Sequence, residues 1–187
     1  AMFISEYYLI YPEGDDRAYT FRTRRKIGLD VDDVLADFIG AYCKQFGMPI
    51  PTAWKFDRKF VERYKELCED KNFFMNLERK FDPCEIPFEP HCYITSRNVP
   101  TEWTEEWLDK KGFPTAPVYT VGSEKSKVQV AEETDIDLFV DDKYENYREL
   151  NEAGILTYLL DMEHNRRYDV GYKRITHLNQ VPVEMTK

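Results

Sequence analysis

The sequence contains no apolar run near the roughly 20 residues that a helix needs to span a bilayer. Its start also lacks the pattern of a signal peptide, because Met2 is followed by Glu6 and Asp15 without a basic beginning or a continuous apolar stretch. The four cysteines form no CxxC pair, and a chain of 187 residues can bury a core without disulfides. These absences predict a protein of the reducing cytoplasm without a membrane segment.

Positive charge is also scarce, since 26 lysines and arginines stand against 35 acidic residues and the net charge is -9. Such a chain repels polyanions unless its basic residues cluster, and the sequence shows no basic cluster. We therefore expect no nucleic acid polymer among its partners. Histidine is rare too: His91, His164 and His177 are far apart in the chain, and none is assigned a role.

From Lys26 onward, short aliphatic or β-branched runs alternate with stretches of helical amphipathic spacing. This alternation is typical of an α/β fold, a parallel sheet with helices on both faces. The expected strands are residues 26–31, 92–95, 118–121, 138–140 and 156–160. The expected helices are residues 34–46, 57–69, 101–111, 127–133 and 144–153, the fourth starting at a capping box formed by Ser126 and Gln129.

Two segments fall outside this alternation. About 60 residues, rich in aromatics, separate the first two expected strands, far more than an ordinary crossover needs. We predict that residues 36–90 form a small helical cap inserted into a core domain of residues 26–35 and 91–187. We predict that residues 1–25 form a hairpin extension. This extension is either an oligomer contact, as in a homodimer, or a local addition to the core domain.

Three of the expected strands end in polar residues, namely Asp30 with Asp32, Thr95 with Ser96, and Asp141 with Asp142. In an open parallel sheet, ligands bind outside the carboxyl ends of the strands, so these residues could face one crevice. Carboxylates held close together resist joint ionisation unless a cation lies between them. Oxygen-rich sites of this kind suit hard cations such as Mg²⁺.

Each of these residues also has a structural interpretation. Aspartates after a strand commonly cap the next helix, and Asp33 is interpreted as such a helix-start residue. Thr95 and Ser96 could be ordinary turn residues, and Lys127 an ordinary surface lysine. The functional interpretation is favoured because all these signals fall, in order along the chain, where a strand ends or a helix starts.

The motifs DVDDV (30–34), YITSR (93–97), Lys127 and DLFVDD (137–142) resemble those of the phosphatase branch of the haloacid dehalogenase (HAD) superfamily. Within that branch, DVDDVLADF and KNFF (71–74) are similar to the 5′(3′)-deoxyribonucleotidase group. The resemblance extends from about residue 26 to residue 175. It implies a HAD-like Rossmannoid sheet and Mg²⁺-dependent hydrolysis of a small phosphomonoester, most closely a nucleoside monophosphate.

The resemblance also implies which carboxylates act. Asp30 would attack phosphorus and form an aspartyl-phosphate, and Asp32 would protonate the leaving oxygen and later activate water. Mg²⁺ would be held by Asp30, by the main-chain carbonyl of Asp32 and by an aspartate of the last motif. Asp142 is preferred as that ligand, with Asp141 orienting water or Lys127.

Further residues would bind the phosphate. Thr95 and the backbone N–H of Ser96 would contact its oxygens, and a lysine would neutralise its charge. Lys127 is preferred over Lys125 because it follows the helix cap directly, where the helix dipole adds positive potential. Arg97 either reaches the phosphate or a sugar hydroxyl, or forms a surface ion pair.

The sequence indicates the identity of the substrate less clearly than it indicates the reaction. Phe38 matches a base-contacting aromatic of the resembled group, and Trp54 or Phe73 could stack on a base, or all three could form the core of the cap. Asp33 departs from that group, which usually has glycine at this position.

Three other functions remain open. The chain could be a phosphatase for another phosphorylated metabolite, or a catalytically silent relative that only binds. A phosphoacceptor receiver domain also uses an acidic pair, an acceptor aspartate, a threonine and a lysine. In that class the acidic pair precedes the acceptor, whereas here it comes last.

Overall fold

The computed structural model describes residues 7–10, 20–55, 57–122 and 124–186. Within these residues, six parallel strands form the central sheet in the order β5-β4-β3-β6-β7-β8. The strands are β3 (Ile27–Leu29), β4 (Cys92–Thr95), β5 (Val118–Thr120), β6 (Leu138–Asp141), β7 (Thr157–Leu160) and β8 (Arg174–Ile175). β3 therefore lies inside the sheet, between β4 and β6.

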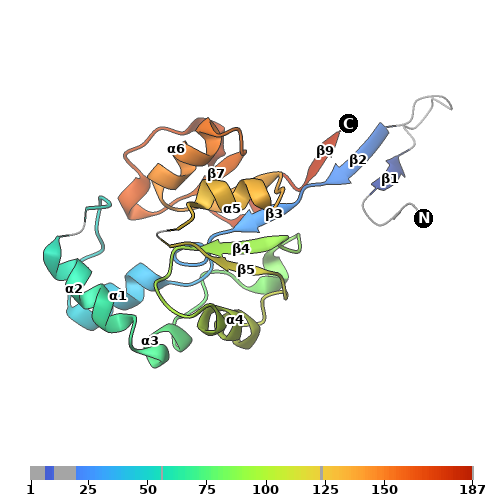
Figure 1. Ribbon diagram of the computed structural model, residues 1–187. Coiled ribbons are helices and arrows are strands. Elements are labelled where there is room, and N and C mark those ends of the chain that lie inside the picture. The colour runs from blue at the N-terminus through green and yellow to red at the C-terminus, as the bar shows by residue number, and fades with distance from the viewer. Residues whose placement is uncertain (1–6, 11–19, 56, 123, 187) are drawn as a thin grey trace.

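Helices cover both faces of this sheet (Figure 1). α5 (Lys127–Glu133) packs on β4, and α6 (Tyr144–Glu152) packs on β6 and β7, on the same face. α4 (Thr101–Lys110) lies on the opposite face and packs on β5. The predicted α/β fold class is therefore confirmed, and the arrangement is consistent with a Rossmann-like HAD fold.

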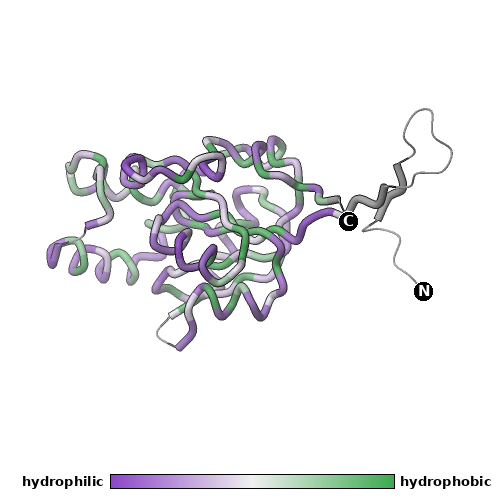
Figure 2. The backbone as a smooth tube through the Cα atoms, turned by 90° about the horizontal axis from the view of Figure 1, so that it is seen from above, coloured by the Kyte–Doolittle hydropathy of each residue, from purple (hydrophilic) through white to green (hydrophobic). Residues whose placement is uncertain are grey.

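The central strands form because their apolar runs are buried on both faces, as in other parallel sheets. Ile27, Leu29 and Phe139 are fully buried. A Cβ atom at Gly28 would lie 2.9 Å from the Phe139 ring, so the close contact between β3 and β6 requires glycine. Hydrophilic and hydrophobic residues alternate along the outer helices in Figure 2, as expected for helices with one buried side.

Most predicted elements are found with small shifts at their ends. The capping box is confirmed, because Ser126 Oγ accepts from Gln129 N–H at 3.2 Å and Gln129 Oε1 accepts from Ser126 N–H at 2.9 Å. The predicted start of the first helix at residue 34 is wrong. α1 spans Phe38–Phe46, and Asp37 caps it by accepting from Gly40 N–H at 3.0 Å. β8 was not predicted, because two residues carry no periodic signal.

α1, α2 (Arg58–Leu67) and α3 (Lys71–Met75) lie together beyond the carboxyl ends of β3 and β4 (Figure 1). Their aromatic side chains pack on one another around Phe38, whose ring contacts those of Tyr42, Tyr64, Phe73 and Phe74. Burial of these rings holds the three short helices together. The division into a cap of residues 36–90 and a core of residues 26–35 and 91–187 stays a prediction.

A second, antiparallel sheet has the order β1-β2-β9, formed by β1 (Tyr7–Ile10), β2 (Thr20–Arg24) and β9 (Glu184–Thr186). Residues 1–6 and 11–19 of the predicted hairpin extension lie outside the described residues. The C-terminal strand β9 was not predicted. Arg25 fastens it, because Nη1 donates to Pro182 O at 2.8 Å and to Glu184 O at 2.7 Å. Over the described residues, every helix is too short or too polar to cross a bilayer.

Candidate active site

Residues from three strand ends and one helix start wall a single cavity of about 230 Å³. Asp30 follows β3, Thr95 ends β4, Asp142 follows β6, and Lys127 is the first residue of α5. Asp32 and Ser96 line the same cavity. The strand order brings these distant segments together, because β3 is flanked by β4 and β6.

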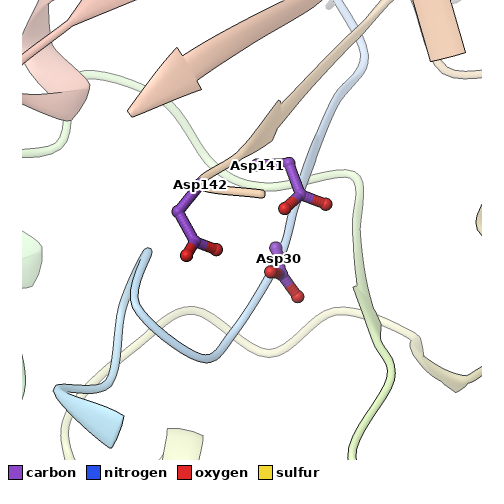
Figure 3. A group of neighbouring side chains, drawn as sticks. All are labelled: Asp30, Asp141 and Asp142. Atoms are coloured by element: carbon purple, nitrogen blue, oxygen red, sulfur yellow. The ribbon is translucent and has the colours of Figure 1, made fainter. Parts of the chain in front are cut away.

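Three carboxylates form a cluster at this edge of the sheet. Asp30, Asp141 and Asp142 are buried, and each offers an oxygen within 4.8 Å of the others (Figure 3). Burial raises the pKa of Asp30 well above its usual value, opposed by the charge of Lys127 and reinforced by those of Asp141 and Asp142. A bound cation would relieve this repulsion, so the cluster could hold a metal ion.

Lys127 supplies the positive charge nearest to the cluster. Its Nζ lies 2.9 Å from Asp30 Oδ1 and 2.8 Å from Asp141 Oδ2, and its side chain is only 7% exposed. Burial disfavours the ammonium, but the charges of Asp141 and Asp30 outweigh burial and raise the pKa of Lys127. Lys125 points elsewhere and pairs with Glu133 at the surface at 2.7 Å. Of the two lysines, Lys127 is the one beside Asp30.

Asp141 is held by protein donors on both of its oxygens. Oδ2 accepts from Lys127 Nζ at 2.8 Å and from Asn146 Nδ2 at 3.0 Å, while Oδ1 accepts from Lys143 N–H at 2.9 Å. A carboxylate occupied in this way is suited to orient Lys127 and is poorly suited to bind a metal directly. That Asp142 rather than Asp141 binds a metal directly stays a prediction, and these hydrogen bonds agree with it.

Asp142 is oriented by a histidine that received no role from the sequence. His164 Nε2 lies 2.8 Å from Asp142 Oδ2, both side chains are buried, and Asn165 Nδ2 donates to Asp142 O at 2.7 Å. Burial raises the pKa of Asp142, and the hydrogen bond to His164 opposes that rise. His164 follows β7 at the same edge of the sheet, so the rule that sites lie at strand ends could have found it.

Asp32 and Arg97 form an ion pair in the cavity wall. Arg97 Nη2 lies 2.7 Å from Asp32 Oδ1, with side chains that are 0% exposed for Arg97 and 22% exposed for Asp32. Arg97 does form an ion pair, but the prediction that the pair lies at the surface is wrong, because the arginine side chain is buried. The guanidinium contacts Asp32 in place of solvent.

The polar wall of the cavity offers donors for an anion. Thr95 is buried, and its Oγ1 accepts from Arg97 N–H at 3.2 Å, which leaves the hydroxyl proton available to a ligand. Ser96 and Asn146 line the same wall, beside Lys127. This side of the cavity can bind a phosphate or a carboxylate.

The opposite wall is aromatic, lined by Phe38, Trp54, Phe60 and Tyr64. Trp54 meets His164 edge to face with the ring centroids 4.8 Å apart. Among the described residues that line this cavity, Phe73 is absent. Its ring packs against those of Phe38 and Phe74, so Phe73 belongs to the core formed by the three helices. A flat apolar group fits against the remaining rings.

No protein-family model matches the chain. A nucleotidase of Clostridium acetobutylicum is 34% identical over 76 residues. This chain is similar in part to a nucleotidase. The aligned region covers 40% of the chain and 39% of that relative, so the chain matches about two fifths of the relative's length.

Asp33 shows why the first turn after β3 is unusual. Its backbone is left-handed with φ 61°, a conformation that favours glycine and that asparagine and aspartate tolerate. Its buried Oδ1 accepts from Ile39 N–H at 2.9 Å in the first turn of α1, but the residue at the start of the helix is Asp37, so the predicted helix-start position of Asp33 is wrong. Burial raises the pKa of Asp33 well above its usual value, and the charge of Asp142 adds to this.

Replacing Asp33 by Asn should stabilise the metal-free protein by about 1 kcal/mol, because the amide keeps the capping bond and removes a buried charge. Asp33→Ala should destabilise it by about 2 kcal/mol, through left-handed strain and the lost cap. An acid with a raised folded-state pKa ionises first in the unfolded chain, so the parent loses stability as pH rises above about 4. Urea unfolding at several pH values tests this, and equal stabilities for both variants would contradict it.

Proposed function

We propose that this protein is a Mg²⁺-dependent phosphomonoester hydrolase of the HAD superfamily that works through an aspartyl-phosphate, most closely a 5′-nucleotidase acting on nucleoside monophosphates. The proposal is carried by one observation: Asp30, Thr95, Lys127 and Asp142 converge on one cavity from separate segments. Phosphoryl transfer needs a nucleophile, a proton donor and positive charge around the phosphate. Asp30 and Lys127 supply the first and the third, and Asp32 in the same cavity supplies the second.

The donors at the acidic cluster suit Mg²⁺, because they are buried oxygens without a histidine or cysteine ligand in the group. Asp30, Asp142 and the main-chain carbonyl of Asp32 would hold the ion. When bound, Mg²⁺ would supply positive charge to the phosphate oxygens and make the crowding of carboxylates tolerable.

The first half of the reaction transfers the phosphoryl group to the protein. A carboxylate oxygen of Asp30 forms a bond to phosphorus as the bond from phosphorus to the ester oxygen breaks. A proton from Asp32 goes to the departing oxygen, which leaves as an alcohol. Lys127 and the Thr95 hydroxyl hold the phosphoryl oxygens during this transfer.

The second half releases phosphate. A water oxygen bonds to phosphorus, the bond to Asp30 breaks, and the proton of the water goes to Asp32, which is thereby ready for the next cycle. The two carboxylates thus divide the chemistry between nucleophile and proton carrier. This division is the reason for placing Asp30 and Asp32 two residues apart at one strand end.

Two observations support a nucleotide as the substrate. The relative that matches 40% of the chain is named a nucleotidase, and the aromatic wall of Phe38, Trp54, Phe60 and Tyr64 could receive a base. Another small phosphorylated metabolite would undergo the same chemistry and differ only at this wall. The cytoplasmic location and the homodimer stay predictions.

A substrate panel tests the proposal. Phosphate release from nucleoside monophosphates and sugar phosphates is measured with Mg²⁺ and after chelation. We expect turnover that requires the metal and a preference for nucleotides. Equal rates on sugar phosphates would reject the nucleotidase assignment, and no metal-dependent release from any ester would reject the phosphatase.

Metal binding can be tested without turnover. At a Mg²⁺ concentration 100 times the dissociation constant, the free energy of unfolding should rise by about 2.7 kcal/mol. Asp142→Asn should lose most of this stabilisation, because the amide is a weaker ligand, whereas Asp109→Asn on the exposed side of α4 should keep it. An equal stabilisation of all three proteins would contradict the assigned site.

A further inference from the structure

Arg97 makes a bidentate contact with Asp32, and the proposed reaction assigns Arg97 no role. Its Nε lies 3.0 Å from both carboxylate oxygens of Asp32, and Nη2 lies 2.7 Å from Oδ1. The planar fork of a guanidinium matches a carboxylate in direction as well as charge, so this contact sets the rotation of the Asp32 side chain.

The guanidinium is itself held rigidly. Arg97 Nη1 lies 3.4 Å from Thr104 Oγ1, and its charge faces the rings of Phe74 at 5.2 Å and Trp107 at 5.8 Å. Trp107 is fully buried and donates from Nε1 to Leu77 O at 3.0 Å. Contacts with α3 and α4 thus fix the Arg97 side chain. Because Asp32 is bonded to this fixed guanidinium, its own side chain is restricted as well.

Two simpler interpretations of Arg97 fit the geometry less well. A phosphate-binding arginine needs donors that face the cavity, but this side chain is 0% exposed, and Nε and Nη2 are directed at Asp32. A purely stabilising pair is a weak explanation, because removing two charges from water costs about as much as their attraction returns. Both residues line the cavity, and Asp32, at 22% exposed, is the more exposed member of the pair.

The pair leaves the two oxygens of Asp32 unequal. Oδ1 accepts from both Nε and Nη2, whereas Oδ2 accepts from Nε alone. Oδ2 therefore keeps more of its capacity for another hydrogen bond. That oxygen is the one suited to exchange a proton with a ligand in the cavity.

We propose that Arg97 is a positioning residue for Asp32, fixing its carboxylate so that Oδ2 faces the leaving oxygen of the substrate. This inference rests on the proposed function. As the bond from phosphorus to the ester oxygen breaks, the proton moves from Oδ2 to that oxygen, and in the second half a proton of water returns to Oδ2. Arg97 exchanges no proton and acts only through the orientation of Asp32.

The proposal predicts that the effect of Arg97 depends on the leaving group. An alkoxide, such as the 5′ oxygen of a nucleoside, needs a proton to depart, whereas nitrophenolate departs without one. Loss of Arg97 should therefore slow the alkyl ester much more than the aryl ester. A general fault in folding or in phosphate binding would slow both alike.

The experiment compares kcat/KM for a nucleoside monophosphate and for p-nitrophenyl phosphate, since this constant includes the step in which the ester bond breaks. Arg97→Gln should lose about 100-fold on the nucleotide and less than about tenfold on the aryl ester. Asp32→Asn should show the same selectivity. Arg97→Lys, which keeps the charge without the fork, should fall between the parent and Arg97→Gln. Arg58→Gln, at an exposed arginine of α2, is the matched control and should resemble the parent.

The outcomes separate this inference from the proposed function. Equal losses on both esters for Arg97→Gln, while Asp32→Asn remains selective, would overturn the positioning role and leave the phosphatase standing. A parent without activity on either ester would overturn the proposed function. If Arg97→Gln does not fold, Arg97→Lys provides the same comparison, and an unselective loss in that variant overturns the inference.

Discussion

Asp30→Asn is expected to lower kcat/KM for phosphate release by at least about 10⁴-fold while the protein stays folded. The amide has the shape of the carboxylate but is a poor nucleophile toward phosphorus. Burial already disfavours the charged form of Asp30, so the substitution should not destabilise the metal-free protein. Steady-state kinetics with a nucleoside monophosphate and Mg²⁺, together with urea unfolding, measure both effects.

A matched substitution separates the nucleophile from a general effect of lost charge. Asp109→Asn changes an exposed aspartate of α4 in the same way and should keep the parent rate. Mass spectrometry of acid-quenched reactions should find a phosphate adduct on the parent and none on Asp30→Asn. Turnover of the Asp30→Asn protein at the parent rate would reject the aspartyl-phosphate.

Lys127→Met is expected to be the most damaging substitution of a basic residue. It removes the ammonium that lies 2.9 Å from Asp30 and 2.8 Å from Asp141, so buried carboxylates lose their compensating charge. Without metal, the free energy of unfolding should fall by about 3–5 kcal/mol. Phosphate release should fall by at least about 100-fold, because the phosphoryl oxygens lose a cation.

Lys125→Met is the natural comparison, two residues away and outside the cavity wall. Its lysine is 55% exposed and pairs with Glu133 at the surface. The variant should lose less than about 1 kcal/mol and keep its activity. Denaturant titrations and rates for the two proteins decide between the lysines, and a larger loss for Lys125→Met would reverse the assignment.

Local signals in the sequence located most elements and most candidate residues. Ser126 and Gln129 lie three positions apart and determine the start of α5 by hydrogen bonds within one turn. Alternating apolar runs predict the parallel sheet, because buried strands need such runs on both faces. Polar residues placed directly after those runs identified Asp30, Thr95 and Asp142, since strand ends share one edge of a parallel sheet.

The first helix marks the limit of such signals. Apolar spacing continues without a break from Val34 to Phe46, but α1 begins at Phe38. The left-handed backbone of Asp33 turns the chain first, and its carboxylate bonds Ile39 N–H six residues later. The spacing of apolar residues cannot reveal the left-handed backbone of Asp33, because a hydrogen bond to a residue further along the chain stabilises it.

The sequence by itself determined the fold class, the strand ends and the kinds of side chain that meet there, because propensity, capping and burial act over a few neighbouring residues. The tertiary structure alone decided which of these side chains touch. It directed Asp141 to Lys127, Asp142 to His164 and Asp32 to Arg97. Those partners are 14, 22 and 65 residues apart, so their contacts depend on strand order and packing, which no local pattern records.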